Sequence, residues 1–341
     1  MEISQLLIRL DAGDRFGLGH LSRCITLVKE FGCSMNRFLV RTDNEQLVYN
    51  FIKRNLEISF ELTVLGENIG HDLDLLTIEQ LSSKGTLLIV DHYHADELYQ
   101  SRLRKLGIRW LQLDSHAKNG FYGDWVMHGS PGATEELYSS LRRRPETKFL
   151  LGPKYCIIKE GLRNSYNERF IRTKVTSVII CFGGGDDRGA TLKTLEAIDF
   201  AAYSDVKFEV AVSEFNKDYN SILDFRNRGL VAVIPTDKLS SSMMEADLAI
   251  IAPGMLSYEA AFLGLPMLLV TLADNQEINS KAWELYGCAL NVGGISEIST
   301  GLADLIKKMY DDGERLTEMS EICLSIVDGE GVKRIIEEIK R

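Results

Sequence analysis

The stretch that decides the fold is V-T-S-V-I-I-C, from Val175 to Cys181. Its β-branched and apolar residues predict a buried strand. It follows a segment, 120–172, in which the regular patterning is interrupted by prolines and by three consecutive arginines at 142–144. We interpret that segment as loops leading to a linker. Val175–Cys181 therefore begins a second domain.

Short apolar runs alternate with segments of helical periodicity on both sides of this break. Before it, we expect strands at 6–10, 37–41, 58–62, 86–91 and 110–114, and helices at 21–31, 47–53 and 98–106. After it, we expect strands at 175–181, 208–212, 230–233, 248–251 and 267–270. This alternation predicts mainly parallel sheets covered by helices. The expected fold is α/β, with two doubly wound, Rossmann-like domains that face a cleft.

The expected domains are residues 1–153 and residues 154–341. A chain of 341 residues is longer than one hydrophobic core usually grows, which also favours two domains. We expect the last helix, 332–340, to return to the first domain. The oligomeric state is left open.

Composition and charge exclude several classes of partner. The net charge of −10 argues against an extended nucleic-acid surface, which needs clustered Lys and Arg. No apolar run approaches the roughly 20 residues that cross a bilayer, and the first residues lack the features of a signal peptide. The six cysteines form no C-x-x-C pair, which favours reduced thiols. We expect a cytoplasmic protein with no nucleic-acid partner and no membrane span.

A histidine, His20, lies between the first expected strand and the first expected helix, in the stretch F-G-L-G-H-L-S-R from Phe16 to Arg23. The positive end of a helix dipole disfavours an imidazolium at His20, and a general base must be neutral. Gly17 and Gly19 leave room for a substrate, while Asp11 and Asp14 could orient the ring or bind hydroxyls. The alternative is a histidine that only caps or packs the helix. We predict that His20 is a catalytic base.

A second glycine-rich loop, F-G-G-G-D-D-R-G-A-T from Phe182 to Thr191, lies between the strongest strand and a helix. Successive glycines let backbone amides converge on a phosphate. The loop matches neither the P-loop nor a strict G-x-G-x-x-G, so neither ATP nor NAD is supported and no cofactor is expected. The alternative is a tight strand–helix connection with no ligand.

The turn I-A-P-G-M-L-S-Y-E-A, from Ile251 to Ala260, again joins a strand to a helix. The amides that open this helix form a candidate diphosphate site. Glu259 lies further along the helix, where a carboxylate could bind both ribose hydroxyls; alternatively, it is a solvated first-turn residue. His92 and His94 in D-H-Y-H could share a metal, but loop polarity explains them better, and no metal is expected.

In collinear order from 6 to 287, these stretches resemble the UDP-sugar hydrolases of bacterial pseudaminic acid biosynthesis. The residues that carry the resemblance are I-R-L-D-A-G with G-L-G-H-L-S-R-C, V-D-H-Y, the F-G-G-G-D loop, and P-G-M-L-S-Y-E-A-A-F-L-G-L-P followed by A-D-N-Q. The family is similar in fold to two-domain GT-B glycosyltransferases. It removes UDP from a 2,4-diacetamido-2,4,6-trideoxy-altropyranose, transferring the sugar to water with inversion at C1 and no required metal.

The resemblance implies a role for each matching position. His20 would be the base, in a first domain (1–153) that also holds the sugar pocket, and the second domain (154–341) would bind UDP. The residues that would bind the rest of the substrate are Asp11, Gly17, Asp91 and Tyr93. The residues that would bind UDP are Gly183, Gly184, Gly185, Asp186, Gly254, Met255, Leu256, Ser257, Glu259 and Asn275.

The stretch W-V-M-H-G-S-P-G, Trp125 to Gly132, departs from the family pattern in a region expected to face the sugar, so the identity of the sugar stays open. A nucleoside diphosphate is a good leaving group, so the paired carboxylates of ordinary glycosidases are not needed. Two other readings remain. One is an inverting GT-B glycosyltransferase that uses a UDP-amino sugar, and the other is a sugar-nucleotide-binding protein without activity.

Overall fold

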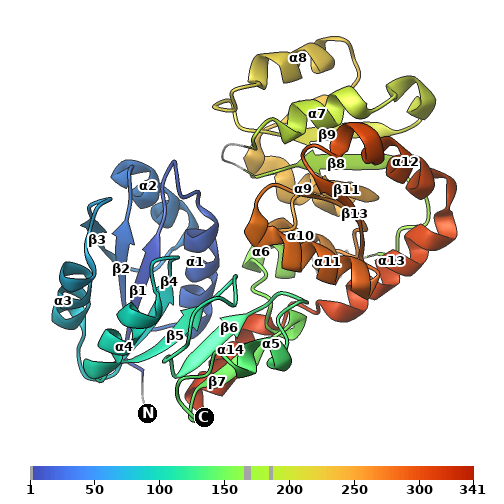
Figure 1. Cartoon of the computed structure of the whole chain (residues 1–341). Helices are drawn as coiled ribbons and strands as arrows, with labels where there is room; N and C mark the ends of the chain where they lie inside the picture. The colour runs from blue at the N-terminus through green and yellow to red at the C-terminus, as the bar shows by residue number, and fades with distance from the viewer. Residues whose placement is uncertain (1–2, 165–169, 184–186) are drawn as a thin grey trace. The chain divides into compact units, whose positions relative to one another are not determined.

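The computed structural model describes residues 3–164, 170–183 and 187–341, without the side chain of Asn275 (Figure 1). The chain forms two compact units. The first comprises Met1–Lys159 together with Gly329–Arg341, and the second comprises Glu160–Asp328. The first unit thus runs past residue 153 and also contains the end of the chain.

A seven-stranded parallel sheet forms the centre of the first unit, in the order β3-β2-β1-β4-β5-β6-β7. Its strands are β1 (Gln5–Asp11), β2 (Met35–Arg41), β3 (Glu61–Leu65), β4 (Thr86–Asp91), β5 (Arg109–Leu113), β6 (Trp125–His128) and β7 (Lys148–Leu151). Its helices are α1 (Gly19–Phe31), α2 (Glu45–Asn55), α3 (His71–Leu81), α4 (Glu97–Lys105), α5 (Glu135–Ser139), η1 (Pro153–Tyr155) and α14 (Gly331–Lys340).

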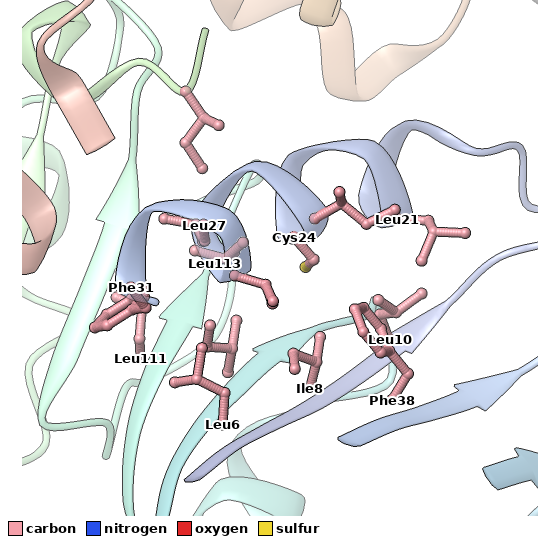
Figure 2. Close-up of a cluster of buried hydrophobic side chains, with 14 of the residues drawn as sticks. Leu6, Ile8, Leu10, Leu21, Cys24, Leu27, Phe31, Phe38, Leu111 and Leu113 are labelled. Carbon is pink, nitrogen blue, oxygen red and sulfur yellow. The ribbon is translucent and has the colours of Figure 1, made fainter. Parts of the chain in front are cut away.

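Helix α1 packs on one face of this sheet because its apolar residues recur at helical spacing. They meet alternate residues of β1, which point to the same face of the sheet. Figure 2 shows the two sets: Leu21, Cys24, Leu27 and Phe31 on the helix, and Leu6, Ile8 and Leu10 on the strand. The helix ends at Gly32, whose φ of 66° lies in the left-handed region. This packing fixes the start of α1, and His20 with it, at the carboxyl edge of the sheet.

The second unit contains a six-stranded parallel sheet in the order β10-β9-β8-β11-β12-β13. Its strands are β8 (Ser177–Cys181), β9 (Lys207–Ala211), β10 (Ala232–Ile234), β11 (Leu248–Ile251), β12 (Met267–Thr271) and β13 (Ala289–Gly294). Its α-helices are α6 (Glu160–Arg163), α7 (Ala190–Ala197), α8 (Tyr219–Asn227), α9 (Leu239–Glu245), α10 (Met255–Phe262), α11 (Glu277–Tyr286), α12 (Ile298–Asp311) and α13 (Gly313–Ile326). Its 3-10 helices are η3 (Phe200–Tyr203), η4 (Thr236–Lys238) and η5 (Asp274–Gln276).

Two helix pairs pack together in the second unit: α7 packs against α12, and α10 against α13. In each sheet the chain adds strands first on one side of the unit's first strand and then on the other side, so both sheets are doubly wound. The prediction of two Rossmann-like α/β domains is confirmed. Among the described helices, none combines the length and the hydropathy that a membrane crossing requires.

The interpretation of 120–172 as loops leading to a linker is wrong in part. The strands β6 and β7 lie in this segment and complete the edge of the first sheet. Each has only four residues, and the prolines nearby mask so short a pattern. The strand expected at 58–62 is Glu61–Leu65, and the elements for which no range was predicted from the sequence include α3 and β13. Strand β13 ends in Gly293-Gly294, which weakens its β signal.

Candidate active site

A pocket opens in the first unit at the carboxyl ends of β4 and β5, the edge where parallel sheets bind ligands. It leaves about 620 Å³ of atom-free space, part of it open to solvent. Its walls are mostly polar, and they are formed by His20, Arg23, Asp91, His92, Tyr93, Ala95, Gln112, Leu113, Asp114, Ser115, His116, Lys118, Asn119 and Phe121.

His20 lies in the first turn of α1, as predicted, and its ring is held from one side. Its Nδ1 is 3.0 Å from the backbone oxygen of Asp91 and 3.0 Å from Asp91 Oδ1. Both atoms accept hydrogen bonds, so the proton of a neutral ring sits on Nδ1. The lone pair is then on Nε2, which lies 3.2 Å from the hydroxyl of Tyr93. A ring in this tautomer can take a proton through Nε2.

Asp91 is a buried carboxylate at the end of β4, with 1% of its surface exposed. Arg23, one turn after His20 on α1, donates to both of its oxygens; the Nε–Oδ2 distance is 2.6 Å. Burial raises the pKa of Asp91, but the positive charge of Arg23 and the contact with His20 outweigh it and hold the pKa well below its ordinary value. Asp91 therefore stays ionised and orients His20.

Tyr93 follows β4 and reaches back over the pocket, with 57% of its surface exposed. Its ring meets His20 edge-on at a centroid distance of 5.0 Å and His116 at 4.7 Å. Burial lowers the pKa of His116, so this second imidazole is neutral near pH 7. Three of the predicted positions, His20, Asp91 and Tyr93, thus meet in one place.

Asp11 and Gly17 have other surroundings. Asp11 is 4% exposed, and its oxygens pair with Arg9 Nη1 at 2.8 Å and Arg41 Nη2 at 2.6 Å, inside a buried network. Gly17 has a φ of 72° and accepts a hydrogen bond from the amide of Gly13, which closes the loop before α1. A side chain at Gly17 would strain this turn. Neither residue lines the pocket.

The turn before α10 is built by Ser257, whose polar groups are used inside the second unit. Its amide donates to the carbonyl of Gly254 at 3.1 Å, and its Oγ donates to the same carbonyl at 2.7 Å. That Oγ also accepts from Trp283 Nε1 at 2.8 Å. Met255 and Leu256 open the helix and are half-buried. Ser257 therefore stabilises the turn through hydrogen bonds within the second unit. The first two backbone amides of helix α10 belong to Met255 and Leu256.

The structure describes only some of the other residues that were predicted to bind the nucleotide. Gly183 is the last described residue after β8 before the gap at 184–186. Its φ of 104° is a backbone conformation that favours glycine. Gly184, Gly185, Asp186 and the side chain of Asn275 lie outside the described part. Glu259 lies on α10 and is 1% exposed. A carboxylate is rarely buried unless it is paired or has a function.

Sequence reasoning missed a group of polar residues on and after β5: Gln112, Asp114, Ser115, His116 and Asn119. The signal that could have found them is their position in the sequence. They lie at or just after the end of the expected strand 110–114, which follows the expected strand 86–91 that ends at Asp91. Adjacent parallel strands bring their carboxyl ends together. Arg23 was also missed, although it lies in the motif quoted for His20.

No protein-family model matches the chain. An uncharacterized protein of Methanocaldococcus jannaschii is 24% identical over 292 residues, which cover 83% of this chain and 58% of that protein. This chain therefore spans less than two thirds of that relative. The spore coat polysaccharide biosynthesis protein SpsG of Bacillus subtilis is 23% identical over 350 residues, covering 95% of this chain and 94% of SpsG.

Solved structures are similar over almost the whole chain. Acinetobacter baumannii MurG superposes with a TM-score of 0.63 at 15% identity, covering 98% of this chain and 99% of MurG. Anabaena HepE in complex with UDP superposes with a TM-score of 0.61 at 13% identity, covering all of both chains. At such identities the likeness is one of fold. The two parallel, doubly wound sheets and these superpositions together identify the chain as a protein of the two-domain GT-B fold.

Proposed function

We propose that this protein is an enzyme that hydrolyses a UDP-linked sugar, releasing UDP and the free sugar with inversion at C1. The substrate would be a UDP-linked acetamido-trideoxy sugar of pseudaminic-type or related amino-sugar biosynthesis. The observation that carries the proposal is the geometry of His20, whose Nδ1 is bound to Asp91 while Nε2 lies 3.2 Å from the hydroxyl of Tyr93; both His20 and Tyr93 line the pocket.

The reaction needs few groups. His20 Nε2 takes a proton from a water molecule, whose oxygen forms a bond to C1 of the sugar. The bond from C1 to the diphosphate oxygen breaks, and its electron pair leaves with UDP. Attack on the face opposite UDP inverts C1. Asp91 holds Nδ1–H and stabilises the imidazolium that forms, as in other acid–base pairs of histidine and carboxylate.

Charge on the departing diphosphate would be stabilised by the second unit. The first amides of α10 offer backbone donors, and the helix dipole favours an anion there. The glycine loop that begins at Gly183 is assigned the same role from its sequence. Glu259 would bind the ribose hydroxyls. These roles of Gly183–Asp186, Gly254–Ser257, Glu259 and Asn275 remain proposals.

Relatives support UDP-sugar chemistry in general. SpsG is named for polysaccharide biosynthesis, and HepE was solved with UDP bound. The same site supports a second candidate, an inverting glycosyltransferase in which a hydroxyl replaces water. The UDP-N-acetylglucosamine–N-acetylmuramyl-(pentapeptide) pyrophosphoryl-undecaprenol N-acetylglucosamine transferase of Clostridioides difficile is 23% identical over 176 residues, covering 48% of this chain and 42% of that enzyme.

The decisive experiment omits any acceptor. The purified protein is incubated with UDP-sugars, and free UDP and reducing sugar are measured. We expect release by the wild type and a loss of about 10²–10⁴-fold in His20→Ala, the usual share of a general base, with UDP affinity unchanged. His71→Ala, on α3, is the matched control and should keep its activity. Release that requires an added hydroxyl compound would favour the transferase, and UDP binding without turnover would contradict both.

A further inference from the structure

Asp114 lies in the pocket with His20 and was not part of the predicted site. It directly follows β5, which pairs with β4, the strand that ends in Asp91. Its Oδ2 accepts two hydrogen bonds, one from the amide of Ala117 at 2.8 Å and one from the hydroxyl of Tyr138 at 2.5 Å. This oxygen is therefore fully used within the protein.

The hydroxyl of Tyr138 is oriented in turn by a buried histidine. Tyr138 has no exposed surface, and its oxygen lies 2.6 Å from Nδ1 of His128, at the end of β6. A phenol has one proton, which Tyr138 gives to Asp114, so His128 donates its Nδ1–H to the phenol oxygen. Burial lowers the pKa of His128 to about 4, and the ring is neutral near pH 7. A complete donor chain thus runs from His128 through Tyr138 to Asp114.

In the described residues, one buried side-chain acceptor of β5 lacks a hydrogen-bond donor, Oε1 of Gln112, a side chain only 3% exposed. Asp114, which follows β5, is half-buried, and both of the hydrogen bonds given above end on Oδ2 rather than on Oδ1. The amide of Gln112 is oriented by its Nε2, which donates to the carbonyl of Leu113 at 3.3 Å. Gln112 and Asp114 are two positions apart, so they point to the same side of the strand. Both line the pocket.

A buried acceptor without a donor is unfavourable, so a ligand that brings donors would be bound selectively here. We propose that Asp114 Oδ1 and Gln112 Oε1 accept hydrogen bonds from hydroxyl or acetamido N–H groups of the sugar, and that Tyr138 and His128 position Asp114. This rests on the proposed function. It names a substrate class, sugars that present neutral donors toward β5. A sugar carboxylate on that side would be repelled by Asp114.

The test compares wild type and variants on UDP-N-acetylglucosamine, UDP-glucose and UDP-glucuronic acid, by initial rates of UDP release and by calorimetric affinity. Asp114→Asn and Gln112→Met should each weaken the neutral sugar that the wild type prefers by about 10–100-fold in KM and sugar affinity. The affinity for UDP itself should not change. Asp114→Asn should also reduce the discrimination against UDP-glucuronic acid.

The positioning role has its own readout. Tyr138→Phe and His128→Leu should raise KM in the same direction as Asp114→Asn, with kcat less affected. His128→Asn keeps an N–H donor near the Nδ1 position and should restore the wild-type KM. Tyr99→Phe is the matched control, because it removes a buried hydroxyl that lies 3.4 Å from the carboxylate of Asp74, outside the pocket.

Two results would overturn the inference: sugar affinities that Asp114→Asn and Gln112→Met leave unchanged, or a parallel loss of affinity for UDP. The proposed function fails separately, when the wild type releases no UDP from any sugar. Calorimetric affinities of the same UDP-sugars then still decide the role of Asp114.

Discussion

At the scale of single residues, the candidate site depends on one carboxylate. Asp91 accepts hydrogen bonds from His20 Nδ1 and from Arg23, so it links the candidate base to a half-buried positive charge. The charge of Arg23 balances that of Asp91, which lets the carboxylate orient the ring inside the protein. Both contacts come from α1, because His20 and Arg23 are three residues apart and lie on one face of the helix.

Asp91→Asn should therefore lower both activity and stability. The amide keeps the shape, but it leaves the guanidinium of Arg23, whose side chain is 12% exposed, beside a neutral group, which costs at most about 3–5 kcal/mol, the range for a fully buried pair. It also removes the anion that stabilises an imidazolium, and we expect kcat to fall by at least about 10²-fold. Urea unfolding and initial rates at a temperature where the variant is folded measure the two effects.

Asp74→Asn is the control for this variant. Asp74 pairs with Arg9 in the same unit, is 3% exposed, and does not line the pocket. It should lose stability in the same way while kcat stays near that of the wild type. If Asp91→Asn kept the wild-type kcat, Asp91 would not act through His20.

At the scale of elements, helix α14 completes the first unit from the far end of the chain. Its buried residues form one apolar stripe, Val332, Ile335, Ile336 and Ile339, which joins the core beneath α1. The stripe recurs at helical spacing, so the sequence predicts an amphipathic helix. Its packing against α1 and η1 brings residues 329–341 beside segments that lie far away in the sequence.

The first residue of α14, Gly331, lies so close to the backbone of Cys156 that only glycine fits there. A Cβ added at Gly331 would lie 2.1 Å from the carbonyl oxygen of Cys156 and 2.8 Å from its nitrogen. Gly331→Ala should therefore displace the helix and lower the free energy of unfolding by about 1–3 kcal/mol, a typical cost of overpacking. Urea unfolding measures the change.

The matched control is Gly301→Ala in α12. There the nearest atom to an added Cβ is 3.8 Å away, so the substitution should be neutral or stabilise by about 0.5–1 kcal/mol. If both variants changed the free energy of unfolding by the same amount, the close backbone contact at Gly331 would not be the reason that position requires glycine.

At the scale of the whole molecule, the two units differ in how they should respond to acid. All six histidines lie between His20 and His128, and hence in the first unit. Two of them are buried, and burial holds the pKa of His92 well below its ordinary value and lowers that of His128 to about 4. Both rings are neutral in the folded state but gain a proton below about pH 6.5 in the unfolded state.

The first unit should therefore lose stability as the pH falls from about 6.5 to 4, since protons bind the unfolded state preferentially. Stability is fully present above the unfolded pKa and declines toward the folded one. His128 alone would contribute about 3 kcal/mol over that interval, at 1.36 kcal/mol for each pH unit. Hydrogen exchange measured by mass spectrometry follows the two units separately.

His128→Asn should reduce this pH dependence in the first unit and leave the second unit unchanged. Equal acid sensitivity in both units, or an unchanged slope in His128→Asn, would contradict the assignment to buried histidines.

Much of this molecule follows from local sequence patterns. The run Thr86–Asp91 and the helix after Gly19 are set by apolar spacing and by the glycines at their ends, so the doubly wound fold and the helical position of His20 are predictable. Periodicity is informative there because each element buries one defined face.

Only the tertiary structure decides which side chains meet. It pairs His20 with Asp91, commits Asp11 to two arginines, adds β6 and β7 to the first sheet, and joins His128 to Asp114 through Tyr138. The physical reason is that a hydrophobic pattern specifies the face an element buries but not its partner. The partners of polar groups at strand ends depend on strand order and long-range packing, which no local window of residues contains.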